Sequence, residues 1–213
     1  MRRFARLRPR PERDAVSEDQ RGSWDMVVER TGRIHGHDSN PANYFNAALN
    51  APALAEGLVR MGTLVRQGQV RGAYTDAERE LIDFVYGEDF DYRGHYTVHL
   101  PDAFACGTRP EAIAAIREGR EDEVLTDEEK LIADHARRVA AGTVTDESWG
   151  PVAEHFGEQG AVEFTIFCGF LVMTLRLWSA LGVPDLEPAE VDELFNGLQD
   201  GTIPIPAADV RIG

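Results

Sequence analysis

The longest apolar segment of the chain, residues 159–181, most constrains what it can fold into. Its sequence, QGAVEFTIFCGFLVMTLRLWSAL, places apolar side chains around almost the whole circumference of a helix. Such a helix must be covered on every side by other elements. Its uncharged part, residues 164–175, is too short to span a bilayer. We therefore expect a buried, central helix.

Helix-start signals recur along the rest of the chain. Capping boxes, in which a Thr is followed three residues later by a Glu, occur at 75–78 and 126–129. They predict helices over about 76–87 and 127–141. Residues 43–67 are expected to form one or two helices, with Pro52 opening the second. Further helices are expected at 25–30, 145–156 and 188–198. Because no strand pattern is visible, the sequence predicts an all-α fold.

Charge divides the chain unevenly. Residues 1–13 contain six Arg and one Glu, whereas the whole chain of 213 residues has a formal net charge of −15. We expect a basic N-terminal arm at 1–25, a helical domain at 26–187, and a C-terminal helix with an extended tail at 188–213. An acidic surface disfavours nucleic acid and anionic membranes as partners. The arm is either a solvated tail or a contact to an acidic neighbouring subunit.

Proton-transferring side chains occur at helical spacing in the middle of the chain. With Asp91 as N-cap, a helix over 91–107 would place Tyr92, His95 and His99 on one face. If this helix forms a hairpin with the 76–87 helix, Glu80 can reach the histidines. A carboxylate there can hold an imidazole in one tautomer and raise its basicity. The spacing therefore predicts one cavity that Glu80 shares with both imidazoles.

Two further residues belong to this pattern. Pro101 follows His99 closely and is expected to kink or restart the helix. Asp83 lies one turn after Glu80 and is a second carboxylate that could share its role.

The motif, written E-x11-Y-x2-H-x3-H-x-P-x-A-x3-G, resembles that of the alkylhydroperoxidase D-like and carboxymuconolactone decarboxylase superfamily. The peroxidase branch of that family has E-x11-C-x2-C-x3-H. Glu80 and His99 match it, whereas Tyr92 and His95 stand where its cysteines are. The resemblance covers about residues 26–184 and is to longer members without the C-x-x-C pair. It implies an alkylhydroperoxidase D-like helical bundle with the site on a helical hairpin, assembled as a dimer, trimer or hexamer.

The resemblance also implies a cofactor-free general acid–base enzyme. It would decarboxylate, eliminate from or isomerise a small oxygenated carboxylate or carbonyl compound, as a lyase or isomerase of a catabolic or natural-product pathway. His99 would be the general acid or base, and Glu80 would orient it. His95 would be a second acid–base group or would bind a substrate carboxylate. Tyr92 would stabilise a developing enolate.

Three more residues are candidates for substrate binding. His37 and Arg176 lie in regions that resemble pocket-lining parts of longer family members. Tyr96 is counted with them, although it is one step off the motif face and packing would also explain it.

The residues leave two other hypotheses open. Glu80, His95 and His99 form a two-His-one-carboxylate set that suits a divalent metal with open positions, such as Zn, Fe or Ni. The chain could also be a non-enzymatic helical scaffold with a retired site.

The cysteines exclude one kind of chemistry. Cys106 and Cys168 are the only two and form no C-x-x-C pair. Thiol peroxidases need an attacking thiolate and a resolving thiol, which Tyr92 and His95 cannot supply. We expect buried free thiols in a cytoplasmic protein.

Overall fold

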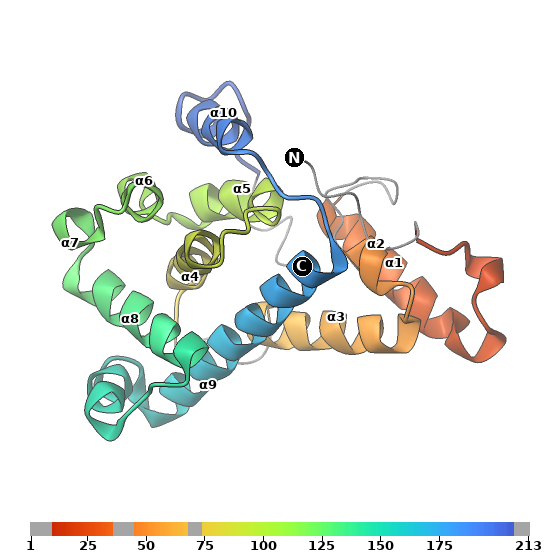
Figure 1. The fold of residues 1–213 in the computed structure, drawn as a ribbon, viewed down its shortest axis with the longest axis horizontal. Coiled ribbons are helices and arrows are strands. Elements are labelled where there is room, and N and C mark those ends of the chain that lie inside the picture. The colour runs from red at the N-terminus through yellow and green to blue at the C-terminus, as the bar shows by residue number, and fades with distance from the viewer. Residues whose placement is uncertain (1–9, 36–44, 68–73, 207–213) are drawn as a thin grey trace.

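A computed structural model describes residues 10–35, 45–67 and 74–206, and this part of the chain is helical without a strand (Figure 1). The predicted all-α class is confirmed. The α-helices are α1 (Arg21–His35), α2 (Phe45–Ala48), α3 (Pro52–Gln67), α4 (Asp76–Asp89), α5 (Tyr96–Cys106), α6 (Pro110–Glu118), α7 (Glu121–Val124), α8 (Asp127–Ala141), α9 (Asp146–Leu181) and α10 (Pro188–Gln199), with 3-10 turns at Arg13–Ala15 and Glu18–Gln20 before them.

Helix α9 runs diagonally through the molecule, with α6–α8 on one side and α1–α3 on the other (Figure 1). It contacts α3, α4 and α8. Its backbone is not helical at Gly157, where φ is 73° and ψ is 163°. The two predicted helices, 145–156 and 159–181, therefore exist as two segments joined at this bend. The larger core surrounds the second segment and includes the buried Phe164, Phe167 and Trp178.

The capping boxes form as predicted. The Thr75 side chain accepts a hydrogen bond from the Glu78 N–H, and the Thr126 side chain accepts one from the Glu129 N–H. In both cases the Glu side chain accepts in return from the Thr N–H. These local signals start α4 and α8, and α4 carries two of the site residues described below.

The start of α5 differs from its predicted position. Asp91 is not an N-cap: its φ is 50°, and the helix begins only at Tyr96, with His95 at the N-cap. Contacts with a distant segment hold the intervening turn, because the Arg93 N–H donates to Asp185 at 2.6 Å. Gly94 packs so closely against the Tyr92 ring and the Pro184 carbonyl that no Cβ would fit there.

Helix α5 does not restart after His99, where Pro101 was predicted to kink or restart it. It continues through Pro101 to Cys106. The proline removes only one backbone hydrogen bond, the one to the carbonyl four residues earlier.

Helix α1 is longer than the predicted 25–30 segment. It begins at Arg21, so the boundary expected after residue 25 falls inside a helix. Trp24 is buried with Val27, Leu49 and Val59 in a second, smaller core beneath α1–α3.

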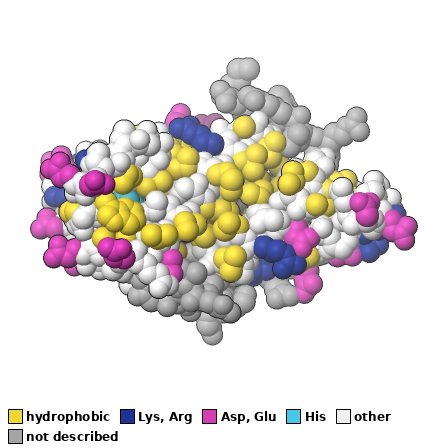
Figure 2. All heavy atoms as spheres, turned by 90° about the horizontal axis from the view of Figure 1, so that it is seen from below, with side chains coloured by type: hydrophobic (Ala, Val, Ile, Leu, Met, Phe, Trp, Pro, Cys, Tyr) yellow, Lys and Arg dark blue, Asp and Glu magenta, His cyan; other side chains and the backbone are white. Residues whose placement is uncertain are grey.

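One side of the molecule, formed by α3 and α9, is strongly apolar. Figure 2 shows a band of hydrophobic side chains along it. We call it the α3/α9 face; the large exposed hydrophobic residues of these two helices are Leu54, Met61, Leu64, Val162, Ile166 and Met173. Among the described helices only α9 is long and apolar enough to cross a membrane, a property that core helices of soluble proteins share.

Candidate active site

The polar groups of the site come from the α4–α5 hairpin. Glu80 and Asp83 lie one turn apart on α4, while His95 and His99 lie at the N-cap and in the first turn of α5. All four are buried. The imidazole centroids of His95 and His99 are 5.5 Å apart. The hairpin therefore brings Glu80, His95 and His99 together. The expected helix over 91–107 would have carried both histidines inside it, whereas His95 lies at the N-cap of α5.

Glu80 and His99 form a hydrogen-bonded pair. Nδ1 of His99 lies 2.8 Å from Oε2 of Glu80. Because a carboxylate can only accept, Nδ1 carries the proton, and Nε2 of the neutral ring has the lone pair. Nη1 of Arg66 is 3.4 Å from the same Nδ1. We interpret that approach as a close contact, since an N–H cannot donate to a protonated nitrogen.

Two guanidinium groups balance the buried carboxylates. Nη2 of Arg66, from the end of α3, lies 2.7 and 2.9 Å from the oxygens of Asp83, and Nη1 lies 3.3 Å from Glu80. Arg79 donates to Glu80 at 2.8 and 3.1 Å. Burial opposes ionisation of Glu80, but His99, Arg79 and Arg66 outweigh it and hold its pKa well below the usual range. Glu80 is therefore an anion at neutral pH.

His95 is held differently from His99. Its Nε2 lies 3.0 Å from the backbone carbonyl of Asp83 and must donate to it. Its Nδ1 is buried and has no hydrogen-bond partner among the described residues. Burial lowers the pKa of His95 to about 4, despite the nearby Asp83 carboxylate. At neutral pH His95 is thus an uncharged imidazole and would not bind a substrate carboxylate as a cation.

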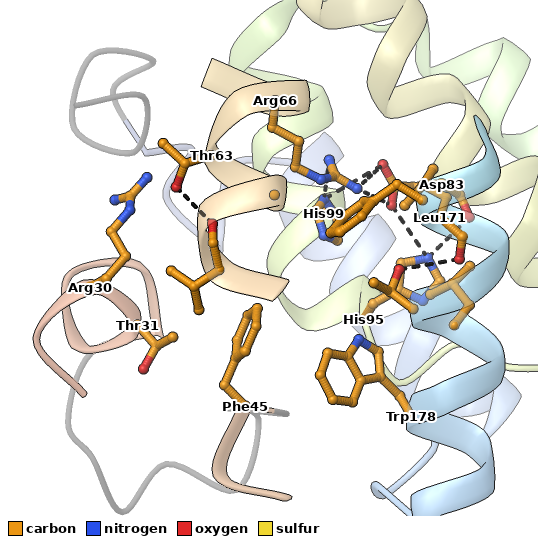
Figure 3. Close-up of a pocket in the computed structure, with 15 residues that line it drawn as sticks. Arg30, Thr31, Phe45, Thr63, Arg66, Asp83, His95, His99, Leu171 and Trp178 are labelled. Atoms are coloured by element: carbon orange, nitrogen blue, oxygen red, sulfur yellow. Dashed lines mark hydrogen bonds and ion pairs between the residues drawn. The ribbon is translucent and has the colours of Figure 1, made fainter. Parts of the chain in front are cut away.

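The polar groups lie at one end of a cavity of about 630 Å³, a volume that includes its open mouth (Figure 3). Arg66, Asp83, His95 and His99 form this end. Arg30, Thr31 and Thr63 line the cavity from α1 and α3 on the other side. The wall between is apolar and consists of Phe45, Val59, Phe170, Leu171, Leu175 and Trp178. Such a shape suits a small, largely apolar molecule with one or two oxygen functions.

No family model, curated protein or solved structure matches the chain. Family membership therefore stays a prediction, and the function is argued from the site.

Several predicted site residues do not line this cavity. The Tyr92 ring lies nearly parallel to His95, with centroids 6.1 Å apart. The Tyr96 hydroxyl donates to the Phe84 carbonyl at 3.2 Å and to Glu88 at 3.1 Å. Arg176 lies over the Phe90 ring at 3.9 Å. None of the three is among the cavity-lining residues, and neither is Glu80, which was expected to share the cavity with both imidazoles. His37 lies outside the described residues.

The metal-ligand geometry also differs from the set expected. Within the described residues, the group whose ligand atoms all lie within 4.8 Å of one another is Glu80, Asp83 and His99. His95, which was expected to be a ligand, is not part of this group.

Arg66 is the site residue that sequence reasoning missed. A signal existed: Ala55 and Val59 are buried on α3, and Gly62 and Arg66 continue the same face at helical spacing. Arg60, on the same helix, does not continue this face. Its side chain is 68% exposed, whereas that of Arg66 is 16% exposed.

Proposed function

We propose that the protein is a cofactor-independent acid–base enzyme that moves a proton at a carbon next to a carbonyl or carboxyl group of a small substrate. The observation that carries this proposal is the 2.8 Å hydrogen bond from His99 to the buried Glu80, with His99 itself at the polar end of an apolar cavity. His99 lines the cavity and its Nδ1 is engaged by Glu80. Nε2 is therefore the nitrogen left for a substrate.

The geometry supports a simple reaction sequence. Nε2 of His99 takes the α proton, and the electrons of the C–H bond move to the carbonyl oxygen to form an enolate. Glu80 stabilises the resulting imidazolium through the Nδ1–H bond. Arg66 lies at the same end of the cavity and places positive charge near the developing oxyanion.

The imidazolium then returns the proton from Nε2. Delivery to a different carbon completes an isomerisation, and loss of a β leaving group instead completes an elimination. In a decarboxylation, Nε2 of His99 first takes a proton from solvent; CO₂ then leaves, the electrons of the broken C–C bond form the enolate, and the imidazolium protonates that carbon. These are the lyase and isomerase reactions that the family resemblance implies. Tyr92 and His95 would act by positioning, because Tyr92 packs on His95 and His95 fixes the Asp83 backbone.

Solvent exchange of an α proton tests the proposal without knowledge of the natural substrate. Phenylacetone and acetophenone report proton abstraction by deuterium uptake in D₂O, followed by proton NMR, and benzoylacetate reports decarboxylation. We expect the wild type to accelerate at least one reaction. His99→Gln should lower the rate by about 10²–10⁴-fold, the usual contribution of a general base.

His155→Gln is the matched control, because His155 pairs with Glu78 at 3.1 Å outside the cavity lining. Its rate should equal that of the wild type. A wild type no faster than buffer with every probe would refute the proposal and favour the scaffold hypothesis. A folded His99→Gln variant with wild-type rates would refute the role of His99.

A further inference from the structure

A cation already lies among the three residues that could bind a metal. Glu80, Asp83 and His99 have ligand atoms within 4.8 Å of one another. The Arg66 guanidinium contacts all three of them, at 2.7 Å to Asp83, 3.3 Å to Glu80 and 3.4 Å to Nδ1 of His99.

We propose that Arg66 occupies the cation position of a latent divalent-metal site formed by Glu80, Asp83 and His99. The native site is then metal-free because the chain supplies its own cation, and removing the guanidinium uncovers a site for Zn²⁺ or Co²⁺. This inference deepens the proposed function, on which it partly rests, by giving the reason that the acid–base pair needs no metal.

The charges of the cluster support this assignment. Glu80 and Asp83 are 1% and 0% exposed, so each needs a nearby positive charge. Without Arg66, Arg79 would be the guanidinium left beside the cluster. It donates to Glu80 and not to Asp83, so the charge of Asp83 would lose its partner. Two carboxylates and one imidazole are donors that Zn²⁺ and Co²⁺ accept, with open positions left for water.

Metal binding and the acid–base role compete for one atom. Nδ1 of His99 faces both carboxylates, at 2.8 Å from Glu80 and 3.7 Å from Asp83, and it carries the proton donated to Glu80. A metal on Nδ1 would displace that proton to Nε2, the nitrogen that must be unprotonated to act as the base. By occupying the metal position, Arg66 therefore keeps the proton of His99 on Nδ1, and it also neutralises the charge of the carboxylates.

The chain contains a matched control for Arg66. Arg79 is also buried and also donates to Glu80, but its other partners are Asp76 and the Arg66 backbone carbonyl. Among the described residues it donates to neither Asp83 nor His99. Arg79→Met removes a buried guanidinium next to the same Glu80 without vacating the centre of the cluster.

The test is a titration of the full-length wild type, Arg66→Met and Arg79→Met with Co²⁺, followed by visible absorption, and with Zn²⁺, followed by calorimetry. We expect Arg66→Met to bind one metal ion per chain, on the order of 100-fold more tightly than the other two proteins, because the ion restores a lost buried charge. Adding Asp83→Asn to Arg66→Met should abolish this binding.

Stoichiometric binding by the wild type, or equal binding by Arg79→Met, would overturn the proposal. So would a folded Arg66→Met variant that binds no metal. If Arg66→Met folds only with metal present, the proposal is supported. If neither Arg66→Met nor Arg66→Gln folds even with metal, the claim that an ion can replace the guanidinium fails. Proton exchange is measured separately, so loss of the proposed activity and loss of the latent site are distinguishable.

The α3/α9 face carries a second, independent inference. Its six large side chains are between 42% and 74% exposed, which amounts to on the order of 600 Å² of apolar surface. That is at the upper end of what a monomer exposes and most of the ~800 Å² that each partner buries in a standard interface. Of the most apolar 18-residue window of α9, only 39% is buried.

We infer that a second copy of this chain covers the α3/α9 face. Val162, Ile166 and Met173 are exposed and, at spacings of four and seven residues, lie on one side of α9. An antiparallel copy whose two-fold axis passes between Gly169 and Phe170 would place Ile166 opposite the partner subunit's Met173. A Cβ at Gly169 would meet no atom within 4 Å, so the helix surface is open there to close approach. A two-fold interface requires this kind of self-matching pattern. The net charge of −15 disfavours an anionic membrane as the occupant.

Sedimentation of Ile166→Glu/Met173→Glu beside the wild type tests the dimer. Val144→Glu is the control, because Val144 is 38% exposed but lies outside the face. We expect a dimer for the wild type and the control at tens of micromolar, and a folded monomer for the double variant. A monomeric wild type would overturn the inference, and so would a double variant that remains a dimer. A monomeric wild type that sediments with phosphatidylcholine vesicles would identify a membrane surface instead.

Discussion

The burial of His95 makes stability depend on pH in a defined window. The side chain is 1% exposed and donates to the Asp83 carbonyl. The ionisable groups that face it are the Asp83 carboxylate at 3.9 Å, the His99 ring and Arg66. Burial dominates these influences and lowers the pKa of His95 to about 4. In the unfolded chain an imidazole titrates near 6.5.

The direction of the effect follows from these two values. Between pH 6.5 and pH 4 the unfolded chain binds a proton at His95 that the folded chain does not, so the free energy of unfolding falls as the pH falls. The difference of about 2.5 pKa units corresponds to about 3 kcal/mol, lost fully once the pH is below 4. Glu80 has a lowered pKa and adds a separate loss at lower pH, below its ordinary value of 4.5.

Urea unfolding followed by far-ultraviolet circular dichroism, repeated between pH 7 and pH 4, measures this dependence. His95→Gln keeps an N–H donor for the Asp83 carbonyl but cannot take up a proton. Its stability should therefore fall by about 3 kcal/mol less than that of the wild type over the window. His135→Gln serves as a comparison, because burial also lowers the pKa of His135. Parallel curves for the wild type and His95→Gln would refute the reasoning.

Further outcomes follow from the same geometry. Replacing both Cys106 and Cys168 with Ser should leave proton exchange unchanged, and the wild type should show no thiol peroxidase activity in a coupled peroxide assay. Tyr96→Phe should cost about 1–3 kcal/mol in urea unfolding, since the Phe84 carbonyl and Glu88 lose the hydrogen bonds of the buried hydroxyl, without changing the exchange rate. Gly87→Ala should cost a similar ~1–3 kcal/mol, because its Cβ would collide with the Tyr96 hydroxyl. Arg176→Gln should leave exchange unaffected, because this guanidinium lies over Phe90; a slower rate would return Arg176 to the site.

Local signals predicted most of the helices. The capping boxes at Thr75 and Thr126 start α4 and α8 where expected, because the bonds that form them join residues only three apart. Pro52 opens α3, and the apolar segment after Gly157 forms the buried part of α9. The approach of Glu80 to His99 followed from hairpin geometry, since both residues lie near the facing helix surfaces.

Other features depend on contacts between segments far apart in the chain. The turn before α5 is held by Asp185, 92 residues after Arg93, so no local pattern could place the helix start at Tyr96. Burial lowers the pKa of His95 and disfavours the cationic one of its two expected roles; burial is a property of the packed cavity that the local sequence does not reveal. Arg66 reaches the hairpin from α3, and its sequence neighbourhood reads as an ordinary helix end.

Arg66 also connects the two inferences about the molecule. Val59, Gly62 and Arg66 point from α3 into the cavity, whereas Met61 and Leu64 on the same helix belong to the α3/α9 face. The position of the guanidinium next to Asp83 therefore depends on how firmly α3 packs against its neighbours. If a second subunit covers that face, dissociation should loosen α3 and weaken the hold of Arg66 on the cluster. We expect the monomeric Ile166→Glu/Met173→Glu variant to bind Co²⁺ measurably more tightly than the wild type while still less tightly than Arg66→Met. Equal affinities for the monomer and the dimer would show that the cavity holds Arg66 without help from the interface.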